Sequence, residues 1–407
     1  MVEPPPAAAY PGSVNTRFLT TSFAIGIASV LSVLTPCALA AADTDGFVPL
    51  FNGVDLSDWV NVNCAPETWA VKGGFLTCNG RPTGALRTPR QYENFILELE
   101  WRHLSSGGNS GIFIWATPIA APGVPFLRGI EVQVLDNEYN VKGRGEWYTT
   151  HGDVFPIHGA TMKPFGRHNG QRSFPSEEHS KTNPDWNHYR IVCTNAVIHL
   201  SVNGTQVSGG EDCNYRKGYI ALESEGGPIQ FRNIRIKELP PGNPAADTTA
   251  PLDQKWQNLF TGVDLRGWNT NGTTAARWTV KNEHLSATAG PANNAATLWT
   301  RREFRDAEFV IDCRPAKPAD QNGTPAVPVL QLRGSDAQAT EVRLEGSKPD
   351  AYQRFVIHVA GREVTVTRDG QELKRMTLPT TVAAQGAVGL RDPGAPCDFM
   401  NLYFREL

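Results

Sequence analysis

Charge of one sign is not in excess in this sequence of 407 residues, which has 38 lysine and arginine residues against 41 aspartate and glutamate residues. No basic stripe is present, so nucleic acid is not an expected partner. Long stretches with helical periodicity are also lacking, and the cysteine spacings do not resemble a zinc site. The lack of helical periodicity favours a protein built from strands.

Long hydrophobic runs are scarce as well. The N-terminal run Phe18–Leu34 is broken by serine and threonine and is followed closely by Pro36. Arg17 precedes it, and Ala38–Ala40 reads Ala-Leu-Ala, which is typical of a cleaved signal peptide rather than a membrane span. Residues 1–42 are therefore predicted to be a signal peptide with a preceding tail. The mature protein is expected to be exported, to the periplasm or the cell exterior, without a stable membrane span.

Cysteine is infrequent, and six cysteines remain once the predicted signal peptide is removed. An even number in an exported protein permits disulfides. The sequence leaves two alternatives open, which are buried free thiols or three pairs: Cys64–Cys78, Cys193–Cys213 and Cys313–Cys397.

One sequence pattern occurs twice. Leu50–Trp59 reads LFNGVDLSDW and Leu259–Trp268 reads LFTGVDLRGW, an offset of 209 residues (259 − 50). The offset is 210 just before the segment 137–184 and 166 after it, so the first copy holds about 44 extra residues (210 − 166). This insert is rich in His, Asp, Glu and Gly, and chemistry is expected where it meets the first copy.

Strand signals dominate both copies. Runs such as Phe95–Trp101 and Val197–Val202 are rich in β-branched and aromatic residues. Asn203-Gly204 and Asp369-Gly370 predict two-residue hairpin turns. The sequence therefore predicts an all-β protein of two antiparallel β-sandwiches in tandem. The expected boundaries are 43–239 for the first sandwich with the insert 137–184, 240–250 for a linker, and 251–407 for the second sandwich.

Alternation along the strands assigns their faces. Ile130, Val132 and Val134 are predicted to point between the sheets, whereas Glu131 and Gln133 point outward. The same rule places Trp115 on the outward face, either as a platform for a sugar ring or as half of an aromatic cross-strand pair.

Several landmarks occur in a fixed order, and together they resemble the 3-keto-disaccharide hydrolase domain, a family first described as a domain of unknown function. These landmarks are LFNGVDLSDW, NSGIFIW (Asn109–Trp115), GIEVQVLD (Gly129–Asp136), DWNHYRI (Asp185–Ile191) and FRNIRIKEL. The resemblance implies a concanavalin-like or laminin-G-like jelly roll. It covers residues 47–239 well and 256–407 more weakly, so the second copy is interpreted as degenerate.

The resemblance also implies an activity, the cleavage of glycosides or disaccharides whose C3 hydroxyl has been oxidised to a ketone. The ketone acidifies the C2 proton, a base removes that proton, and the bond from C1 to the leaving oxygen breaks by elimination. Water then adds, so the net change is hydrolysis. Such an enzyme needs a base near C2, a stabiliser for charge on the C3 oxygen, and an acid for the leaving oxygen.

Four residues are candidate catalytic groups: Glu131, Asp136, His151 and His158. Asp136 has no counterpart in the second copy, whereas Glu131 is matched by Glu341 and so has a structural role as its alternative. A neutral histidine could take the C2 proton, because its pKa lies near working pH. Alternatively, His151 or His158 could hold a divalent metal together with Glu131 or Asp136, and the metal would polarise the ketone.

Six further residues are candidate substrate ligands: Gln133, Trp115, Asn109, Asp153, Glu178 and Lys181. The last three lie in the insert, and a loop of that length is usually functional or disordered. The alternative for these insert residues is that they cap the loop or form its solvated tip.

Two other functions stay open. A retaining glycosidase places carboxylates on one strand as E-x-D-x-x-E, and Glu131-x-Gln133-x-x-Asp136 has a similar spacing with two departures. A non-catalytic glycan-binding sandwich is the other, since fold alone does not fix function. The second copy lacks the insert and is expected to bind glycan or to brace the first copy.

Overall fold

The computed structural model describes residues 45–270, 276–288, 296–317, 326–335 and 338–407. The described residues belong to one compact unit, and the segment predicted to be a signal peptide lies outside them. Within the described part, no helix is long and apolar enough to cross a membrane. Strands form four sheets of antiparallel pairs, with two short 3-10 helices at Val141–Gly143 and Ala246–Thr248. The all-β prediction is confirmed.

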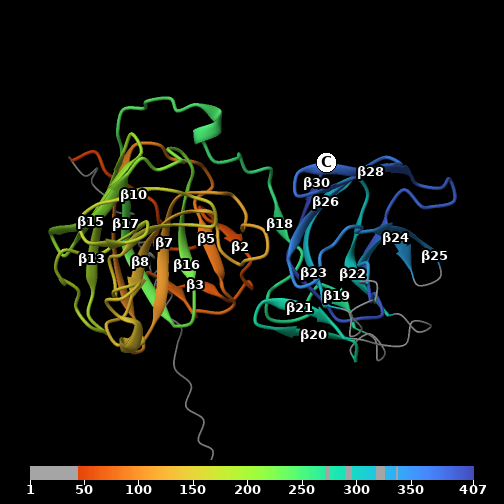
Figure 1. Cartoon of the computed structure of the whole chain (residues 1–407), viewed down its shortest axis with the longest axis horizontal. Helices are drawn as coiled ribbons and strands as arrows, with labels where there is room; N and C mark the ends of the chain where they lie inside the picture. The colour runs from red at the N-terminus through yellow and green to blue at the C-terminus, as the bar shows by residue number, and fades with distance from the viewer. Residues whose placement is uncertain (1–44, 271–275, 289–295, 318–325, 336–337) are drawn as a thin grey trace, which may run out of the picture. The chain divides into compact units, whose positions relative to one another are not determined.

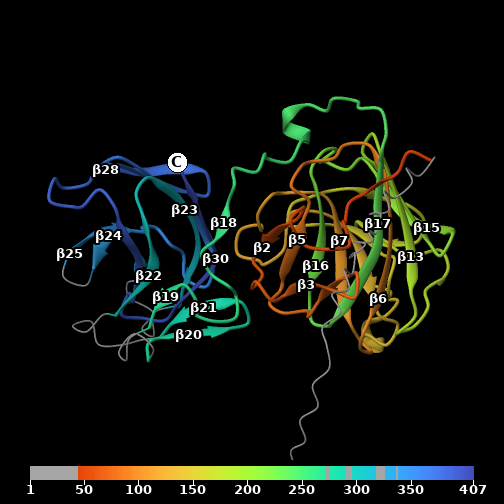
Figure 2. The ribbon, with the colours of Figure 1, turned by 180° about the vertical axis from the view of Figure 1, so that it is seen from behind.

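Two sheets make up the first sandwich (Figures 1 and 2). Sheet A runs in the order β10 (Lys163–Pro164), β15 (Thr205–Glu211), β14 (Val197–Val202), β13 (Asn187–Thr194), β6 (Phe95–His103), β17 (Ile229–Glu238), β4 (Phe75–Cys78) and β3 (Trp69–Lys72), with β1 (Val48–Pro49) paired to β17. Sheet B runs in the order β11 (His168–Asn169), β12 (Arg172–Ser173), β9 (Val154–Ile157), β8 (Gly129–Leu135), β7 (Asn109–Ala116), β16 (Tyr219–Ser224), β5 (Gly84–Arg87) and β2 (Val60–Val62).

The other two sheets make up the second sandwich. Sheet C runs in the order β20 (Trp278–Lys281), β21 (His284–Ala287), β30 (Cys397–Glu406), β23 (Ala307–Pro315), β26 (Gln353–Ala360), β27 (Glu363–Arg368) and β28 (Gln371–Thr377), with β18 (Gln257–Asn258) paired to β30. Sheet D runs in the order β19 (Trp268–Asn269), β22 (Thr297–Phe304), β29 (Gly386–Arg391), β24 (Val329–Ser335) and β25 (Gln338–Arg343).

The two sandwiches have the same strand order. The run β14-β13-β6-β17-β4-β3 in sheet A corresponds to β27-β26-β23-β30-β21-β20 in sheet C, and β8-β7-β16-β5-β2 corresponds to β25-β24-β29-β22-β19. The predicted hairpin turns are confirmed, with φ of +49° at both Asn203 and Asp369. A common origin for the two sandwiches stays a prediction.

The core of the first sandwich lies between sheets A and B, as alternation predicts. Ile130, Val132 and Val134 of β8 pack with residues such as Leu97 on β6 and Ile191 on β13, and all five are at most 2% exposed. Burial on this scale supplies the main free energy of folding.

The six cysteines of the described part are all buried free thiols. Of the two alternatives that the sequence leaves open, the structure therefore has the free thiols. Burial raises the pKa of each of these thiols, which keeps it protonated and chemically inert.

The outward placement predicted for Trp115 is wrong. The register between β7 and β16 shifts between Phe113 and Ala116, and Trp115 has a φ of +52°. This bulge turns the indole into the core, where it is 0% exposed and donates its N–H to the Glu93 carbonyl at 2.8 Å. A buried ring cannot serve as a platform for a sugar.

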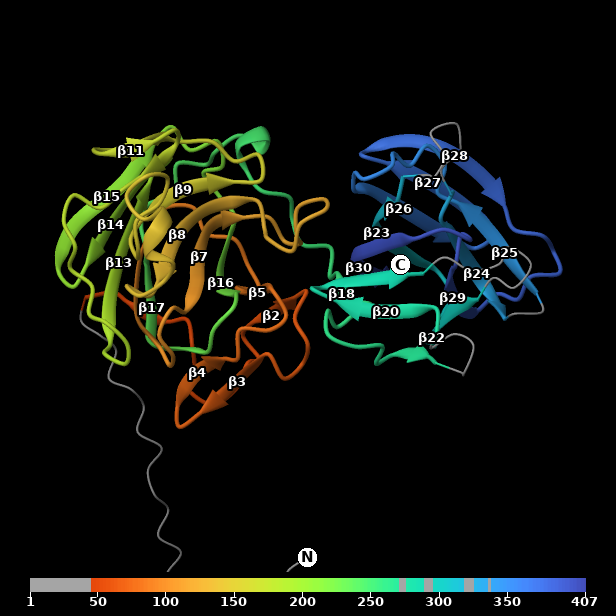
Figure 3. The same cartoon turned by 60° about the horizontal axis from the view of Figure 1, so that its bottom comes forward.

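The insert is partly regular and extends both sheets of the first sandwich. Strand β9 pairs with β8 (Figure 3). Strand β12 pairs with β9, and β10 pairs with β15. These insert strands have no counterpart in the described strands of sheets C and D. The insert thus brings its own side chains alongside the outward face of sheet B.

Candidate functional site

Two glutamates converge on the outward face of sheet B, where β7 lies between β8 and β16. Glu131 is on β8 and Glu223 is on β16, and Gly111 of β7 separates them. A Cβ atom added to Gly111 would lie 2.8 Å from Glu131 Oε1 and 3.0 Å from Glu223 Oε2. The absence of a side chain at Gly111 is therefore what allows both carboxyl groups to reach over β7.

A third glutamate joins them. The carboxyl groups of Glu225 and Glu223 are hydrogen-bonded to each other, and Asn109 Nδ2 donates to Glu225 Oε2. We call Glu131, Glu223 and Glu225 the carboxyl cluster. Glu131 accepts no hydrogen bond from the residues that the structure describes, and Glu223 Oε2 is buried without a partner among them.

A chain of polar contacts connects the insert to this cluster. Arg172 Nε donates to Asp153 Oδ2 at 2.7 Å, and Arg172 Nη2 donates to Gln133 Oε1 at 2.7 Å. Gln133 Nε2 in turn donates to Asn109 Oδ1 at 3.0 Å. The Arg172 guanidinium also lies 3.6 Å from the centroid of Phe155, the cross-strand neighbour of Glu131. The insert thereby positions the polar groups beside the carboxyl cluster.

Burial governs the protonation of the carboxyl cluster. Burial, followed by the negative charge of Glu225, raises the pKa of Glu131 to about 8, although the Arg172 cation opposes the shift. Burial and the charge of Glu131 raise the pKa of Glu223 well above its usual range, and burial raises that of Glu225. Glu131 is 6% exposed and Glu223 is 1% exposed. Glu131 and Glu223 therefore hold protons at neutral pH, as carboxyl groups in dry sites do.

Such a cluster can act both as an acid and as a base. A carboxyl group whose pKa lies near working pH is populated in both forms, which is the condition for efficient proton transfer. A carboxyl group that stays neutral can donate a hydrogen bond to a developing oxyanion. Glu131 suits the first role and Glu223 suits the second.

In the second sandwich, the glutamate that matches Glu131 has a different environment. Glu341 on β25 forms an ion pair with Arg391, and the two side chains are 39% and 38% exposed. No buried carboxyl cluster forms there among the described residues. The alternative of a purely structural glutamate therefore suits Glu341, whereas Glu131 is buried, unpaired and perturbed.

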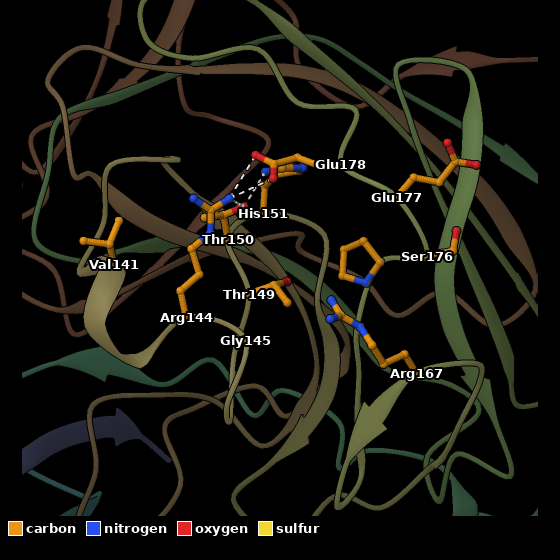
Figure 4. Close-up of a pocket in the computed structure, with 11 residues that line it drawn as sticks. Val141, Arg144, Gly145, Thr149, Thr150, His151, Arg167, Ser176, Glu177 and Glu178 are labelled. Carbon is orange, nitrogen blue, oxygen red and sulfur yellow. Dashed lines mark hydrogen bonds and ion pairs between the residues drawn. The ribbon is translucent and has the colours of Figure 1, made fainter.

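A separate pocket of about 590 Å³ lies within the insert (Figure 4). We call it the insert pocket, and it is lined by Val141, Arg144, Gly145, Thr149, Thr150, His151, Arg167, Pro175, Ser176, Glu177 and Glu178. Arg144 Nη2 donates to both carboxylate oxygens of Glu178, at 2.8 and 3.0 Å, on one side of the pocket. None of the carboxyl cluster is part of this lining.

His151 is a neutral imidazole in the wall of the insert pocket. Burial, and then the positive charge of Arg144, lowers its pKa to about 3. Its Nδ1 atom lies 3.2 Å from Asn137 Oδ1 and 3.1 Å from Thr150 Oγ1. Because an amide oxygen only accepts, Nδ1 carries the hydrogen. Nε2 then has a free lone pair, and it is buried without a partner among the described residues.

The structure does not bring the four candidate catalytic residues into one pocket. Glu131 belongs to the carboxyl cluster and His151 to the insert pocket. His158 lies on the turn after β9, where its exposed ring stacks on Phe126 at a centroid distance of 5.6 Å. Stacking on the partly buried ring of Phe126 gives His158 no proton-transfer partner.

Asp136 has a loop-capping position. Its Oδ1 atom accepts hydrogen bonds from the backbone N–H groups of Gly107 and Glu138, both at 3.0 Å, and Oδ2 accepts one from Asn183 at 3.4 Å. A carboxylate occupied in this way does not face Glu131 across an open site. The strand pattern expected of a retaining glycosidase therefore lacks its second free carboxylate.

The candidate substrate ligands also lie at separate places. Gln133, Asn109 and Asp153 lie in the polar chain beside the carboxyl cluster, whereas Glu178 lines the insert pocket. The Lys181 side chain is exposed, and its backbone N–H and C=O bond to Asn187, so the position of Lys181 is that of a loop anchor.

The alternative of a divalent metal is not supported by the side chains present. Within the described ranges, no three His, Cys, Asp or Glu side chains are grouped so that they could hold a metal ion. His151 and His158 lie at separate places, and the oxygens of Asp136 face backbone amides. These residues do not fit the metal site considered from the sequence.

Sequence reasoning missed Glu223, Glu225 and Arg172. The two glutamates stand two positions apart where β16 ends, so alternation could have placed them on one face had this strand been predicted. Their proximity to Glu131 depends on β16 pairing with β7, which the local sequence does not reveal. Arg172 lies in the insert, and nothing local marks it.

Comparison with known proteins identifies the first sandwich. Residues 46–237 match the sequence model of the 3-keto-alpha-glucoside-1,2-lyase-like domain, so the resemblance predicted from the sequence is confirmed for this segment. The chain is also 25% identical to the 3-keto-disaccharide hydrolase of Bacteroides thetaiotaomicron over 235 residues, which cover 48% of this chain and 80% of that protein. These findings support a carbohydrate-active function.

Among solved structures, two proteins of Parabacteroides distasonis, both provisionally described as glycosyl hydrolases, are similar to part of the chain. One has a TM-score of 0.39 and 20% identity, covering 48% of this chain and 95% of its own. The other has a TM-score of 0.37 and 25% identity, covering 47% and 99%.

Proposed function

We propose that the first sandwich cleaves the glycosidic bond of 3-keto-glycosides by removing the C2 proton, eliminating the leaving group and adding water. The observation that carries this proposal is the carboxyl cluster, in which Glu131 and Glu223 converge over Gly111 with raised pKa values. The domain match and the Bacteroides relative supply the substrate class.

In the first step, Glu131 acts as the base. Its ionised form takes the proton from C2, and the electron pair of the C–H bond forms a C2–C3 double bond. The C3 oxygen then carries the negative charge of an enolate. Glu223 stays protonated and donates a hydrogen bond to that oxygen, which stabilises the charge where it develops.

In the second step, the electrons of the enolate expel the leaving group. The enolate oxygen re-forms the C3 carbonyl, the C2 electron pair forms the C1–C2 double bond, and the bond from C1 to the leaving oxygen breaks. Glu131, now protonated, gives its proton to the leaving oxygen. Addition of water then places a hydroxyl on C1 and a proton on C2, so the sum of the steps is hydrolysis.

The polar contacts of Arg172 position the side chains beside the carboxyl cluster. Arg172 binds Asp153 and Gln133 and leaves the Glu131 carboxyl without a hydrogen bond of its own. A bound Asp153–Arg172 pair limits how far the cation lowers the pKa of Glu131, which keeps the pKa near neutrality.

The test is the rate at which a 3-keto-disaccharide is cleaved. Glu131→Gln is expected to lower kcat by about 10³-fold or more, because the amide cannot exchange the proton. Glu138→Gln is the matched control, since Glu138 is an exposed glutamate in the loop after β8, and it should keep the wild-type rate. Full activity of Glu131→Gln would refute the assignment. Binding of unoxidised glycans without turnover of any 3-keto substrate would instead favour a glycan-binding module.

A further inference from the structure

The insert pocket is a polar cavity that the chemistry assigned to the carboxyl cluster does not use. Its volume of about 590 Å³ falls in the range of sites that hold a small organic ligand. We propose that the insert pocket is a subsite that binds a neutral sugar unit of the glycan substrate, remote from the ring that reacts. This inference rests on the proposed function, because it extends the substrate from one reacting ring to a longer glycan.

The charge of the pocket indicates a neutral ligand. The lining contains two arginines, Arg144 and Arg167, and two glutamates, Glu177 and Glu178, so its cationic and anionic side chains are equal in number. Arg144 is already neutralised by Glu178. A phosphate or a uronic acid would meet as many carboxylates as guanidinium groups. A neutral polyol can donate to the first and accept from the second without a net electrostatic penalty.

The uncharged part of the lining suits hydroxyl groups. Thr149, Thr150 and Ser176 add hydroxyls that both donate and accept. His151 adds an imidazole whose Nε2 lone pair has no partner in the described part of the chain. Its low pKa keeps that lone pair available at neutral pH. A sugar hydroxyl that reached Nε2 would satisfy a buried acceptor, which is worth more than a bond to an exposed one.

Thr149 connects the insert pocket to the reacting end. It lines the pocket, and its backbone N–H donates to Asp153 Oδ2 at 2.9 Å, while its hydroxyl donates to Oδ1. Asp153 holds Arg172, which contacts Gln133 beside the carboxyl cluster. A short run of directly bonded side chains thus connects the insert pocket to the carboxyl cluster.

The experiment measures binding of three unoxidised probes, maltotriose, cellotriose and laminaritriose, by NMR titration of the full chain. We expect at least one of them to bind with a Kd in the millimolar range. Arg167→Ala removes an exposed cation of the lining and should raise Kd about fivefold. The double variant Arg144→Ala/Glu178→Ala, which keeps the net charge, should raise it tenfold or more. Arg216→Ala, an exposed arginine outside the lining, is the control and should leave Kd unchanged.

The outcomes separate this inference from the proposed function. Glu131→Gln should bind the same trisaccharide as the wild type while losing turnover. If none of the three probes binds, or if Arg167→Ala and the double variant both leave Kd unchanged, the subsite proposal is overturned. Tighter binding of a trisaccharide of uronic acids than of every neutral trisaccharide also overturns the subsite proposal. If Glu131→Gln keeps full turnover while the pocket variants still weaken binding, the proposed chemistry fails and the subsite stands.

Discussion

Replacing Glu131 by glutamine should stabilise the fold while removing activity, and the size of the effect follows from the pKa. A glutamate titrates at 4.5 when solvated, and in the folded chain Glu131 titrates at about 8. Between these values the unfolded chain loses the proton and the folded chain keeps it, so stability falls as pH rises from 4.5 to 8. At pH 7 the loss is (7 − 4.5) × 1.36, or about 3 kcal/mol.

Glutamine has nearly the shape of a protonated glutamate and does not titrate. Glu131→Gln should therefore match the unfolding free energy of the wild type near pH 4 and exceed it by about 3 kcal/mol at pH 7. Urea denaturation of both proteins at the two pH values measures the difference. The exposed control Glu138→Gln should show no such pH dependence.

A different result would refute the reasoning. If Glu131→Gln is less stable than wild type at pH 7, the carboxyl group is ionised and stabilised in the fold, and it cannot be the buried proton carrier described above. An equal gain at pH 4 and pH 7 would show that packing, not titration, is responsible.

Three further predictions follow from the same contacts. Gly111→Ala should lower kcat/KM at least tenfold and stability by about 1–3 kcal/mol, because the new Cβ would lie 2.8 Å from Glu131 Oε1; kinetics that match wild type would contradict the convergence over Gly111. Asp136→Ala should lower the unfolding free energy by about 2 kcal/mol by releasing backbone N–H groups, with kcat of the folded protein unchanged; lost kcat at full stability would restore Asp136 as a catalytic group. His151 has its pKa lowered to about 3, so the wild type should lose stability as pH falls below 6.5, by about 2 kcal/mol at pH 5. Denaturation of His151→Gln should lack that loss, and a slope that persists in the variant would assign it to another group.

Much of the fold could be predicted because alternation and turn chemistry are local. The apolar series Ile130, Val132 and Val134 fixes which face of β8 is buried, and the Asn203-Gly204 turn needs a backbone that tolerates positive φ. The error at Trp115 has a physical cause. A bulge adds one residue to a strand and reverses the alternation after it, and its position depends on the partner strand rather than on the sequence of β7.

The candidate site could be predicted only in part. Glu131 and Gln133 could be predicted because alternation places them on one face of a strand, Asn109 because it begins the NSGIFIW landmark, and Asp153 because it lies in the insert. Glu223 was missed because its place beside Glu131 is set by a pairing across more than 100 residues of chain. His151 and Glu131 were expected in one site because both are chemically suited to proton transfer, yet the insert folds so that His151 faces a pocket of its own.

Deuterium labelling tests the central claim most directly. A 3-keto-disaccharide is incubated with the enzyme in heavy water, and the released 3-keto sugar is examined for deuterium at C2. Proton abstraction by Glu131 predicts one deuterium at C2 in the product of the wild type, and none in any product recovered with Glu131→Gln. Cleavage at the wild-type rate with hydrogen retained at C2 would contradict the account, because the glycosidic bond would then break without an enolate.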